Sequence, residues 1–138
     1  ISPKKYFEKG DILFAITGES VEDIGKCIAY TGKEKCLLGG DIVAMKHNQY
    51  PQFLAYALST KEAIRQKGLG KVKLKVVHTN IPALKTIRIY LPNISTQKHI
   101  VSHLDKLSSK VRAIEEKYQK MVEECDALKQ AMLRDVFE

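Results

Sequence analysis

The sequence predicts an α+β (α/β-type) domain followed by one long C-terminal coiled-coil helix. Residues 1–93 contain short runs of β-forming residues with two short helical stretches between them, which is typical of a mixed domain. Residues 94–138 contain no proline or glycine, and their apolar residues recur every three or four positions. We therefore divide the chain into a domain over residues 1–93 and a helix over residues 94–138.

The first half of the domain is predicted to be mainly β-structure. Residues 11–16 and 26–30 are short β-rich runs, and the polar loop between them has a glycine at each end. This pattern predicts a β-hairpin with a long tip. A third run over residues 36–45 contains Gly39 and Gly40, which indicate a bulge or a bend.

Two short helices are expected next. Pro51 suits the first position of a helix, whose buried face would consist of Phe53, Leu54, Ala57 and Leu58. Residues 59–62 have the spacing of a capping box, which predicts that a second helix begins there and ends at Gly68.

The last part of the domain is predicted to contain two strands. Apolar and basic residues alternate strictly over residues 71–76, which would place three lysines on one face of a strand: Lys71, Lys73 and Lys75. A short turn over residues 79–85 would lead to a second alternating strand over residues 87–91, which Pro92 ends.

The C-terminal helix has the clearest pattern in the sequence. Its apolar residues step by four and three over nearly five heptads: Ile100, Leu104, Leu107, Val111, Ile114, Tyr118, Met121, Cys125, Leu128 and Met132. Ser95 or Thr96 could cap its start. The helix would be about 60 Å long at 1.5 Å per residue, whereas a domain of this size is only about 35 Å across. We therefore expect the far half to protrude and this apolar seam to be buried against a partner helix.

The partner helix could belong to a second copy of the chain. In a parallel pair Lys110 would face Glu115 of the other copy, whereas in a centred antiparallel pair it would face Lys117. Charge therefore favours parallel self-pairing. Each exposed pair contributes only about 0.3–0.5 kcal/mol, so this preference leaves both orientations open.

The positive charge is confined to the domain. Residues 1–93 hold 15 Lys/Arg and 8 Asp/Glu, a net charge of +7, whereas residues 94–138 hold 8 of each. Residues 63–93 hold seven basic residues and no acidic one. Such a stretch attracts a polyanion such as duplex DNA, although a solvated surface that only aids solubility would have the same composition.

Several other classes of protein are disfavoured. No apolar run is long enough to span a bilayer, so we expect no membrane association. The three cysteines Cys27, Cys36 and Cys125 form no CxxC pair, which favours a reducing, cytoplasmic compartment and argues against structural zinc. We find no phosphate-binding loop, dinucleotide motif or nuclease cluster. The sequence therefore predicts no catalytic residue, no metal and no cofactor.

Four segments, in this order, resemble the specificity subunits of type I restriction–modification systems. They read GDILFAITGESVEDIGKCIAY, LGGDIVAMK with PQFLAYALST, IRIYLPNISTQKHIVSHLDKL, and LKQAMLRDVFE. One departure is Thr96, which stands before Gln97 where the family often has glutamate. The resemblance covers nearly the whole chain.

This resemblance implies a non-catalytic protein that recognises duplex DNA. In that family a subunit carries two target-recognition domains, each followed by a long helix. The two helices pair antiparallel, so that the domains read the two halves of a split site, and methyltransferase and restriction subunits supply the chemistry. Residues 1–93 would then be a target-recognition domain that lacks its usual N-terminal part. Residues 94–138 would be the spacer, paired with a second copy or a sister helix.

We expect two groups of residues to contact DNA. Basic side chains would hold phosphates: Lys26, Arg65, Lys67, Lys71, Lys73 and Lys75. Polar residues would reach base edges: Thr17, Glu19, Ser20, His78 and Asn80. Two alternatives stay open. One is a coiled-coil interaction protein whose basic domain binds an acidic protein, and the other is the recognition domain of a fused restriction–methylation enzyme.

Overall fold

The computed structural model describes residues 5–18, 26–67, 72–73, 76–78 and 81–137. The backbone forms two compact units, Ile1–Val101 and Ser102–Glu138. The described residues of the first unit form small antiparallel sheets, three short helices and the start of the long helix α4, and the second unit holds the rest of α4. This is the predicted α+β domain followed by a long helix.

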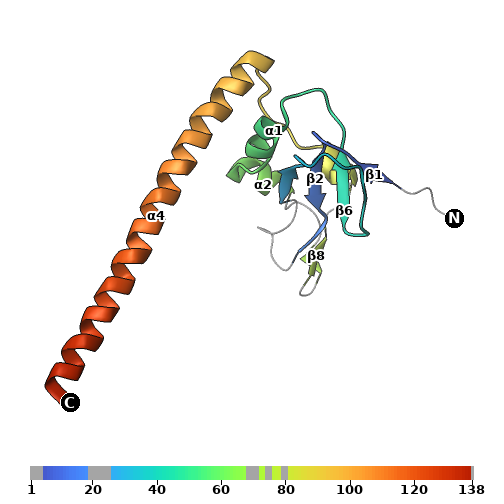
Figure 1. Cartoon of the computed structure of the whole chain (residues 1–138). Coiled ribbons are helices and arrows are strands. Elements are labelled where there is room, and N and C mark those ends of the chain that lie inside the picture. Colours follow the sequence, from blue (N-terminus) through green and yellow to red (C-terminus); the bar gives the residue numbers. More distant parts are fainter. Residues whose placement is uncertain (1–4, 19–25, 68–71, 74–75, 79–80, 138) are drawn as a thin grey trace. The chain divides into compact units, whose positions relative to one another are not determined.

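The central sheet of the first unit has the order β4-β2-β6 (Figure 1). Strand β2 (Ile12–Ala15) pairs antiparallel with β4 (Cys27–Ala29), which confirms the predicted hairpin. On its other side β2 pairs with β6 (Ile42–Met45). Because β2 is paired on both edges, its side chains are the best buried of the three strands.

The predicted run over residues 36–45 is divided into two strands. Strand β5 (Cys36–Leu37) pairs with β1 (Tyr6–Phe7), whereas β6 joins the central sheet. Gly39 and Gly40 lie between them, so the predicted bend separates two sheets.

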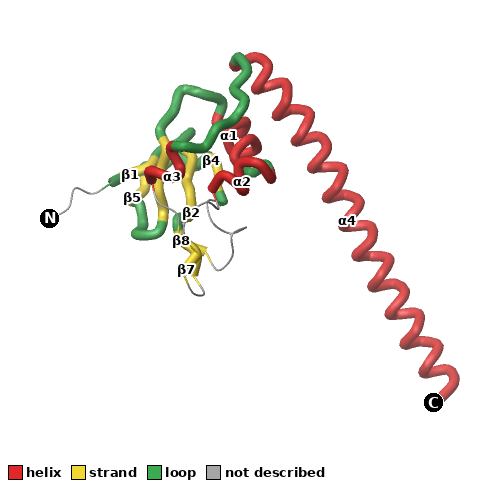
Figure 2. Tube along the Cα trace, turned by 180° about the vertical axis from the view of Figure 1, so that it is seen from behind, coloured by secondary structure: helices red, strands yellow, loops and turns green. Residues whose placement is uncertain are grey.

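Helices α1 (Pro51–Leu58) and α2 (Lys61–Lys67) form as expected, and α1 packs against β4 and β2 (Figure 2). The predicted face of α1 is buried at Phe53, Leu54 and Leu58 and partly buried at Ala57. The predicted capping box is wrong in detail. Thr60 Oγ1 accepts a hydrogen bond from the Ala63 amide at 3.3 Å, whereas the hydroxyl of Ser59 donates to the carbonyl of Ala55.

The single strand predicted over residues 71–76 is not formed. Strand β7 (Val72–Lys73) pairs antiparallel with β8 (Val76–His78), with Lys73 opposite Val76, so the chain reverses between them. Alternation defines which residues share a face but does not determine where a strand ends. A hairpin pairs backbone groups that a lone strand would leave without partners. The expectation of three lysines on one continuous strand is therefore wrong, and Lys71 and Lys75 lie outside the described residues.

The region before the long helix also differs from the prediction. In place of a simple turn, residues Ile81–Lys85 form the short helix α3. Residues 87–91 are not a strand, although their alternation persists, since Ile87 and Ile89 are half-buried and Arg88 is exposed. The side-chain amide of Gln66 accepts from the Arg88 N–H at 2.7 Å and donates to its carbonyl at 3.2 Å. This side chain replaces the hydrogen bonds of a neighbouring strand.

Helix α4 (Ile94–Phe137) is continuous over 44 residues. Asn93 caps it in place of the predicted Ser95 or Thr96, because its Oδ1 accepts from the Thr96 amide at 2.9 Å. The first turns of α4 belong to the domain, since Val101 joins the core with Ile12, Phe14, Cys27, Phe53, Leu54 and Leu58. Within the described part of the chain, no helix is both long enough and apolar enough to cross a membrane.

Candidate nucleic-acid interface

The third sheet, in the order β3-β8-β7, carries three of the predicted DNA-contacting residues. Strand β3 (Thr17–Gly18) pairs with β8 so that Thr17 lies directly opposite His78. Lys73 lies on β7, the other neighbour of β8. The fold therefore joins on one small sheet residues that are about 60 positions apart in the sequence.

This third sheet is connected directly to the core sheet, because β3 follows β2 almost immediately in the chain. Only Ile16 separates the two strands, and its amide donates to the carbonyl of Asp41 at 3.0 Å. Strand β2 is central and buried, so the chain leaves the core sheet at a fixed point and enters the third sheet immediately. Five predicted contact residues lie outside the described residues: Glu19, Ser20, Lys71, Lys75 and Asn80.

Lys26 and Arg65 are both exposed, as a phosphate contact requires. The guanidinium of Arg65 forms two hydrogen bonds with the carboxylate of Glu62, at 2.9 Å and 2.8 Å. These hydrogen bonds lower the pKa of the Glu62 carboxyl. Arg65 therefore shares its charge with an acidic neighbour, and a phosphate would have to compete with that carboxylate.

The structure corrects the prediction for Lys67, whose side chain is only 1% exposed. Its Nζ donates to the carbonyl of Leu58 and lies 5.7 Å from the ring centroid of Phe14. Burial lowers the pKa of this lysine. A side chain enclosed in this way does not reach a phosphate.

The position of Lys67 in its helix explains the burial. Lys67 follows the buried Ala63 by four residues, and residues at this spacing lie on the same helix face. The Ala63 side of α2 faces the core, so Lys67 does too. This spacing is visible in the sequence. The prediction of a phosphate contact instead treated Lys67 as one member of the basic stretch over residues 63–93 and did not consider which helix face it lies on.

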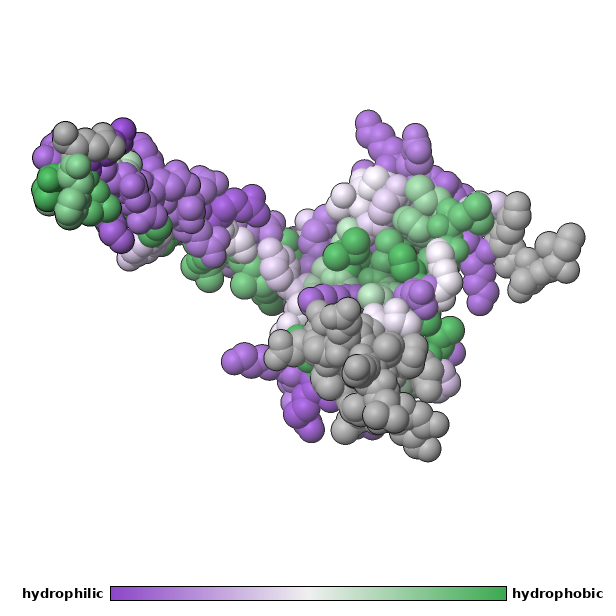
Figure 3. Space-filling model, turned by 90° about the horizontal axis from the view of Figure 1, so that it is seen from below, coloured by the Kyte–Doolittle hydropathy of each residue, from purple (hydrophilic) through white to green (hydrophobic). Residues whose placement is uncertain are grey.

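Most of the predicted coiled-coil seam is exposed within this chain. Ile100 packs partly against the domain core and Leu104 is half-buried, whereas the remaining members are open to solvent: Leu107, Val111, Ile114, Tyr118, Met121, Cys125, Leu128 and Met132. Figure 3 shows hydrophobic atoms at the surface of this helix beside hydrophilic ones. Contact of these seam residues with a partner helix stays a prediction.

The described residues show no sign of a metal centre, since no three His, Cys, Asp or Glu side chains among them are placed to hold an ion. The three cysteines are free thiols. Burial raises the pKa of the Cys27 thiol, which disfavours the thiolate form.

We compared the chain with curated proteins and with models of protein families. No curated protein matches the chain. A family model described as the type I restriction modification DNA specificity domain matches residues 2–124, which is most of the chain. The chain therefore belongs to the family of type I restriction modification DNA specificity domains.

Proposed function

We propose that this chain reads one half of a split DNA site as part of a specificity subunit, with the sheet β3-β8-β7 at the DNA and helix α4 as the spacer. The observation that carries the proposal is that Thr17 pairs with His78 on a sheet whose third strand holds Lys73, in a member of this family. Polar and basic residues on one small sheet can hold phosphates and approach base edges at the same time.

The charge distribution supports this role. The net charge of +7 resides entirely in residues 1–93, and the helix region is neutral. Attraction to phosphates is long-ranged and independent of sequence, so it would bring the domain to DNA before any base is read. A neutral helix would add little to that attraction, as suits a spacer.

The length of the seam supports a split site. The stripe from Ile100 to Met132 is about 50 Å long at 1.5 Å per residue. One turn of DNA spans about 34–36 Å. Two domains at opposite ends of such a spacer, paired through a second copy or a sister helix, would sit about one to one and a half turns apart. Methyltransferase and restriction subunits would supply the chemistry that this chain lacks.

The test is the affinity for duplex DNA measured over a range of salt concentrations. Each phosphate contact that is lost should reduce the slope of log affinity against log salt by about 0.9. We expect Lys26→Ala, Arg65→Ala and Lys73→Ala to reduce the slope one by one and to weaken binding alike on every DNA sequence. Thr17→Ala and His78→Ala should instead change the sequence preference.

The matched control is Lys120→Ala, because Lys120 is an exposed lysine on α4 that pairs with Glu124. It should leave the slope unchanged. If Lys73→Ala behaves like Lys120→Ala, the sheet β3-β8-β7 is not the DNA surface, and if Lys26→Ala and Arg65→Ala do so too, the domain holds DNA elsewhere or not at all. If the chain binds an acidic protein and shows no salt-dependent affinity for DNA, the alternative interaction protein is correct.

A further inference from the structure

Helix α2 ends at Lys67, a buried basic residue that the proposed DNA contacts do not use. A charged group is costly to bury unless other groups replace the water that it loses. Methionine or leucine would fill the same space without that cost. A lysine at this position therefore needs a reason other than packing.

The ammonium of Lys67 lies among groups from three other elements. Its Nζ donates a hydrogen bond to the carbonyl of Leu58 at the C-terminal end of α1, where the helix dipole favours a cation. It lies 5.7 Å from the ring centroid of Phe14 on β2, which is within the range of a cation–π interaction. The Sγ of Cys27 on β4 is 4.0 Å away. The ammonium therefore joins the end of α2 to α1 and to two strands of the core sheet.

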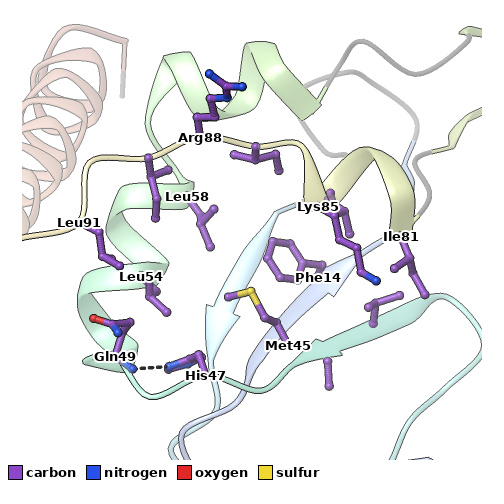
Figure 4. Close-up of a pocket in the computed structure, with 15 residues that line it drawn as sticks. Phe14, Met45, His47, Gln49, Leu54, Leu58, Ile81, Lys85, Arg88 and Leu91 are labelled. Carbon is purple, nitrogen blue, oxygen red and sulfur yellow. Dashed lines mark hydrogen bonds between the residues drawn. The ribbon is translucent and has the colours of Figure 1, made fainter.

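Phe14 links this contact to the proposed DNA surface. Figure 4 shows its ring in the apolar pocket between the core sheet and α1. Strand β3 begins at Thr17, three residues after Phe14, and strand β7 begins at Val72, five residues after Lys67. Two of the segments that enter the sheet β3-β8-β7 therefore start near side chains that lie against each other in the core.

The hydrogen bond gives this link a direction that apolar packing lacks. Apolar contacts tolerate small shifts of a helix, whereas an ammonium that donates to one carbonyl holds the end of α2 at one place. Ala63, the other buried residue of α2, contributes only a methyl group. Lys67 is therefore the side chain that can define where the last turn of α2 ends.

We propose that Lys67 is a positioning residue for DNA recognition, whose ammonium fixes the end of α2 so that β7 and β3 flank β8 in the observed register. This inference rests on the proposed function of that sheet. Lys67 itself does not touch DNA. Removing its ammonium should impair the reading of bases and leave the attraction to phosphates intact, because exposed cations provide that attraction.

The test variant is Lys67→Met, which keeps an unbranched apolar stem but has no charge and no donor. Its matched control is Ala63→Gly, on the same buried face one turn earlier, which weakens the helix and leaves the ammonium in place. Lys67→Met should unfold at about the wild-type urea concentration, since the relief of a buried charge offsets the lost hydrogen bond. Ala63→Gly should unfold at a lower one.

The DNA probe is a duplex that the wild type enriches from a random-sequence library, and a scrambled duplex is the reference. The ratio of the two affinities measures sequence discrimination. Lys67→Met should lower this ratio at least about tenfold, a loss comparable to one mismatched base pair. The slope of log affinity against log salt should not change. Ala63→Gly should keep both quantities.

Amide hydrogen exchange provides a readout without DNA. The paired amides of β3 and β8 should exchange faster in Lys67→Met than in the wild type, whereas those of β2 and β4 should not. If exchange in β3 and β8 is unchanged, the ammonium does not hold this sheet.

The wild type allows a measurement that needs no variant. Burial lowers the pKa of Lys67 and raises the pKa of its titratable neighbour, the Cys27 thiol. Raising the pH should therefore discharge Lys67 before a lysine of ordinary pKa, about 10.4. The discrimination ratio should fall in that range while the salt slope is retained. A ratio that stays constant until the slope itself falls would overturn the role of the charge, whether or not Lys67→Met folds.

Two further outcomes would overturn the proposal. If Lys67→Met and Ala63→Gly lower the ratio equally, α2 acts only through its stability. If Lys67→Met reduces the salt slope, Lys67 contributes to phosphate binding. Failure of the proposed function looks different, because the wild type would then enrich no sequence. The hydrogen-exchange comparison would still test whether Lys67 holds the sheet.

Discussion

Helix α4 has two parts that differ in burial: its first turns are packed into the domain, and the rest of the helix is not. Its first turns, residues 94–101, hold the fully buried Gln97 and the buried Val101. From Ser102 to Phe137 no residue of the helix is buried, although the apolar repeat continues at full regularity. The comparison shows that a regular apolar repeat does not by itself reveal whether its residues are buried within the chain, whereas the buried polar side chain of Gln97 lies where the helix is covered in a specific way.

Gln97 shows what such specificity requires. Its Oε1 accepts from the Tyr50 amide at 3.0 Å, and its Nε2 donates to Gln49 Oε1 at 2.8 Å and to the Pro92 carbonyl at 2.7 Å. One side chain thus joins the start of α4 to the residues that precede α1. Buried amides are stable only when their partners are placed in this way.

The largest effect is expected in the exposed part of α4. Leu107→Lys/Ile114→Lys would place unpaired charges in a helix pair, and each such charge costs about 3–5 kcal/mol. Any self-association of the chain should therefore weaken by more than about a hundredfold. Sedimentation equilibrium of the wild type and the variant measures this. A wild type that stays monomeric at high concentration would contradict self-pairing, and only pairing with a sister helix would then remain.

The next largest effect is expected at Gln97. Gln97→Ala leaves a cavity and removes the partners of the Tyr50 amide and the Pro92 carbonyl, so the free energy of unfolding should fall by about 3 kcal/mol. Gln97→Glu keeps the volume but cannot donate, and it should be destabilising as well. The control is Gln119→Ala, since Gln119 is exposed and its side chain donates to the carboxylate of Glu123 at the surface. Urea unfolding measures the free energy of unfolding of both variants. If Gln97→Ala and Gln119→Ala lower it equally, the buried amide of Gln97 does not distinguish the first turns of α4 from the rest of the helix.

Two valines on the same helix allow a matched test of packing. Val101 is 3% exposed and Val111 is 46% exposed. Val101→Ala should destabilise the domain by about 2 kcal/mol, mainly through two lost methyl groups. Val111→Ala should change monomer stability by less than about 0.5 kcal/mol. If Val111→Ala instead lowers stability in a manner that depends on protein concentration, the seam is paired.

The smallest effect is expected at the cap. Asn93→Ala removes the acceptor of the Thr96 amide, which should cost about 1 kcal/mol. Asn93→Asp should retain most of the stability, because aspartate caps equally well. Thermal unfolding followed by circular dichroism distinguishes the two. A larger loss in Ser95→Ala than in Asn93→Ala would show that the cap lies at Ser95.

Much of the fold was predictable because its signals are local. The β2–β4 hairpin, the start of α1 at Pro51 and the continuous helix α4 follow from alternation, proline geometry and the 3.5-residue repeat. The errors occurred where pairing decides the structure. Residues 72–73 pair antiparallel with residues 76–77 in place of one continuous strand, and residues 87–91 kept their alternation without becoming a strand. Composition cannot distinguish a segment that pairs with a strand from one whose backbone is bonded by a single glutamine side chain.

The sequence by itself determined the two-part organisation, the location of the positive charge and the family resemblance, which the family model confirmed. Only the tertiary structure placed Thr17 opposite His78, buried Lys67 in the core and fastened the start of α4 through Gln97. The physical reason is the range of the interactions. Periodicity and charge are properties of neighbouring residues, whereas strand register and the burial of a polar group depend on which distant segments the packed chain brings together.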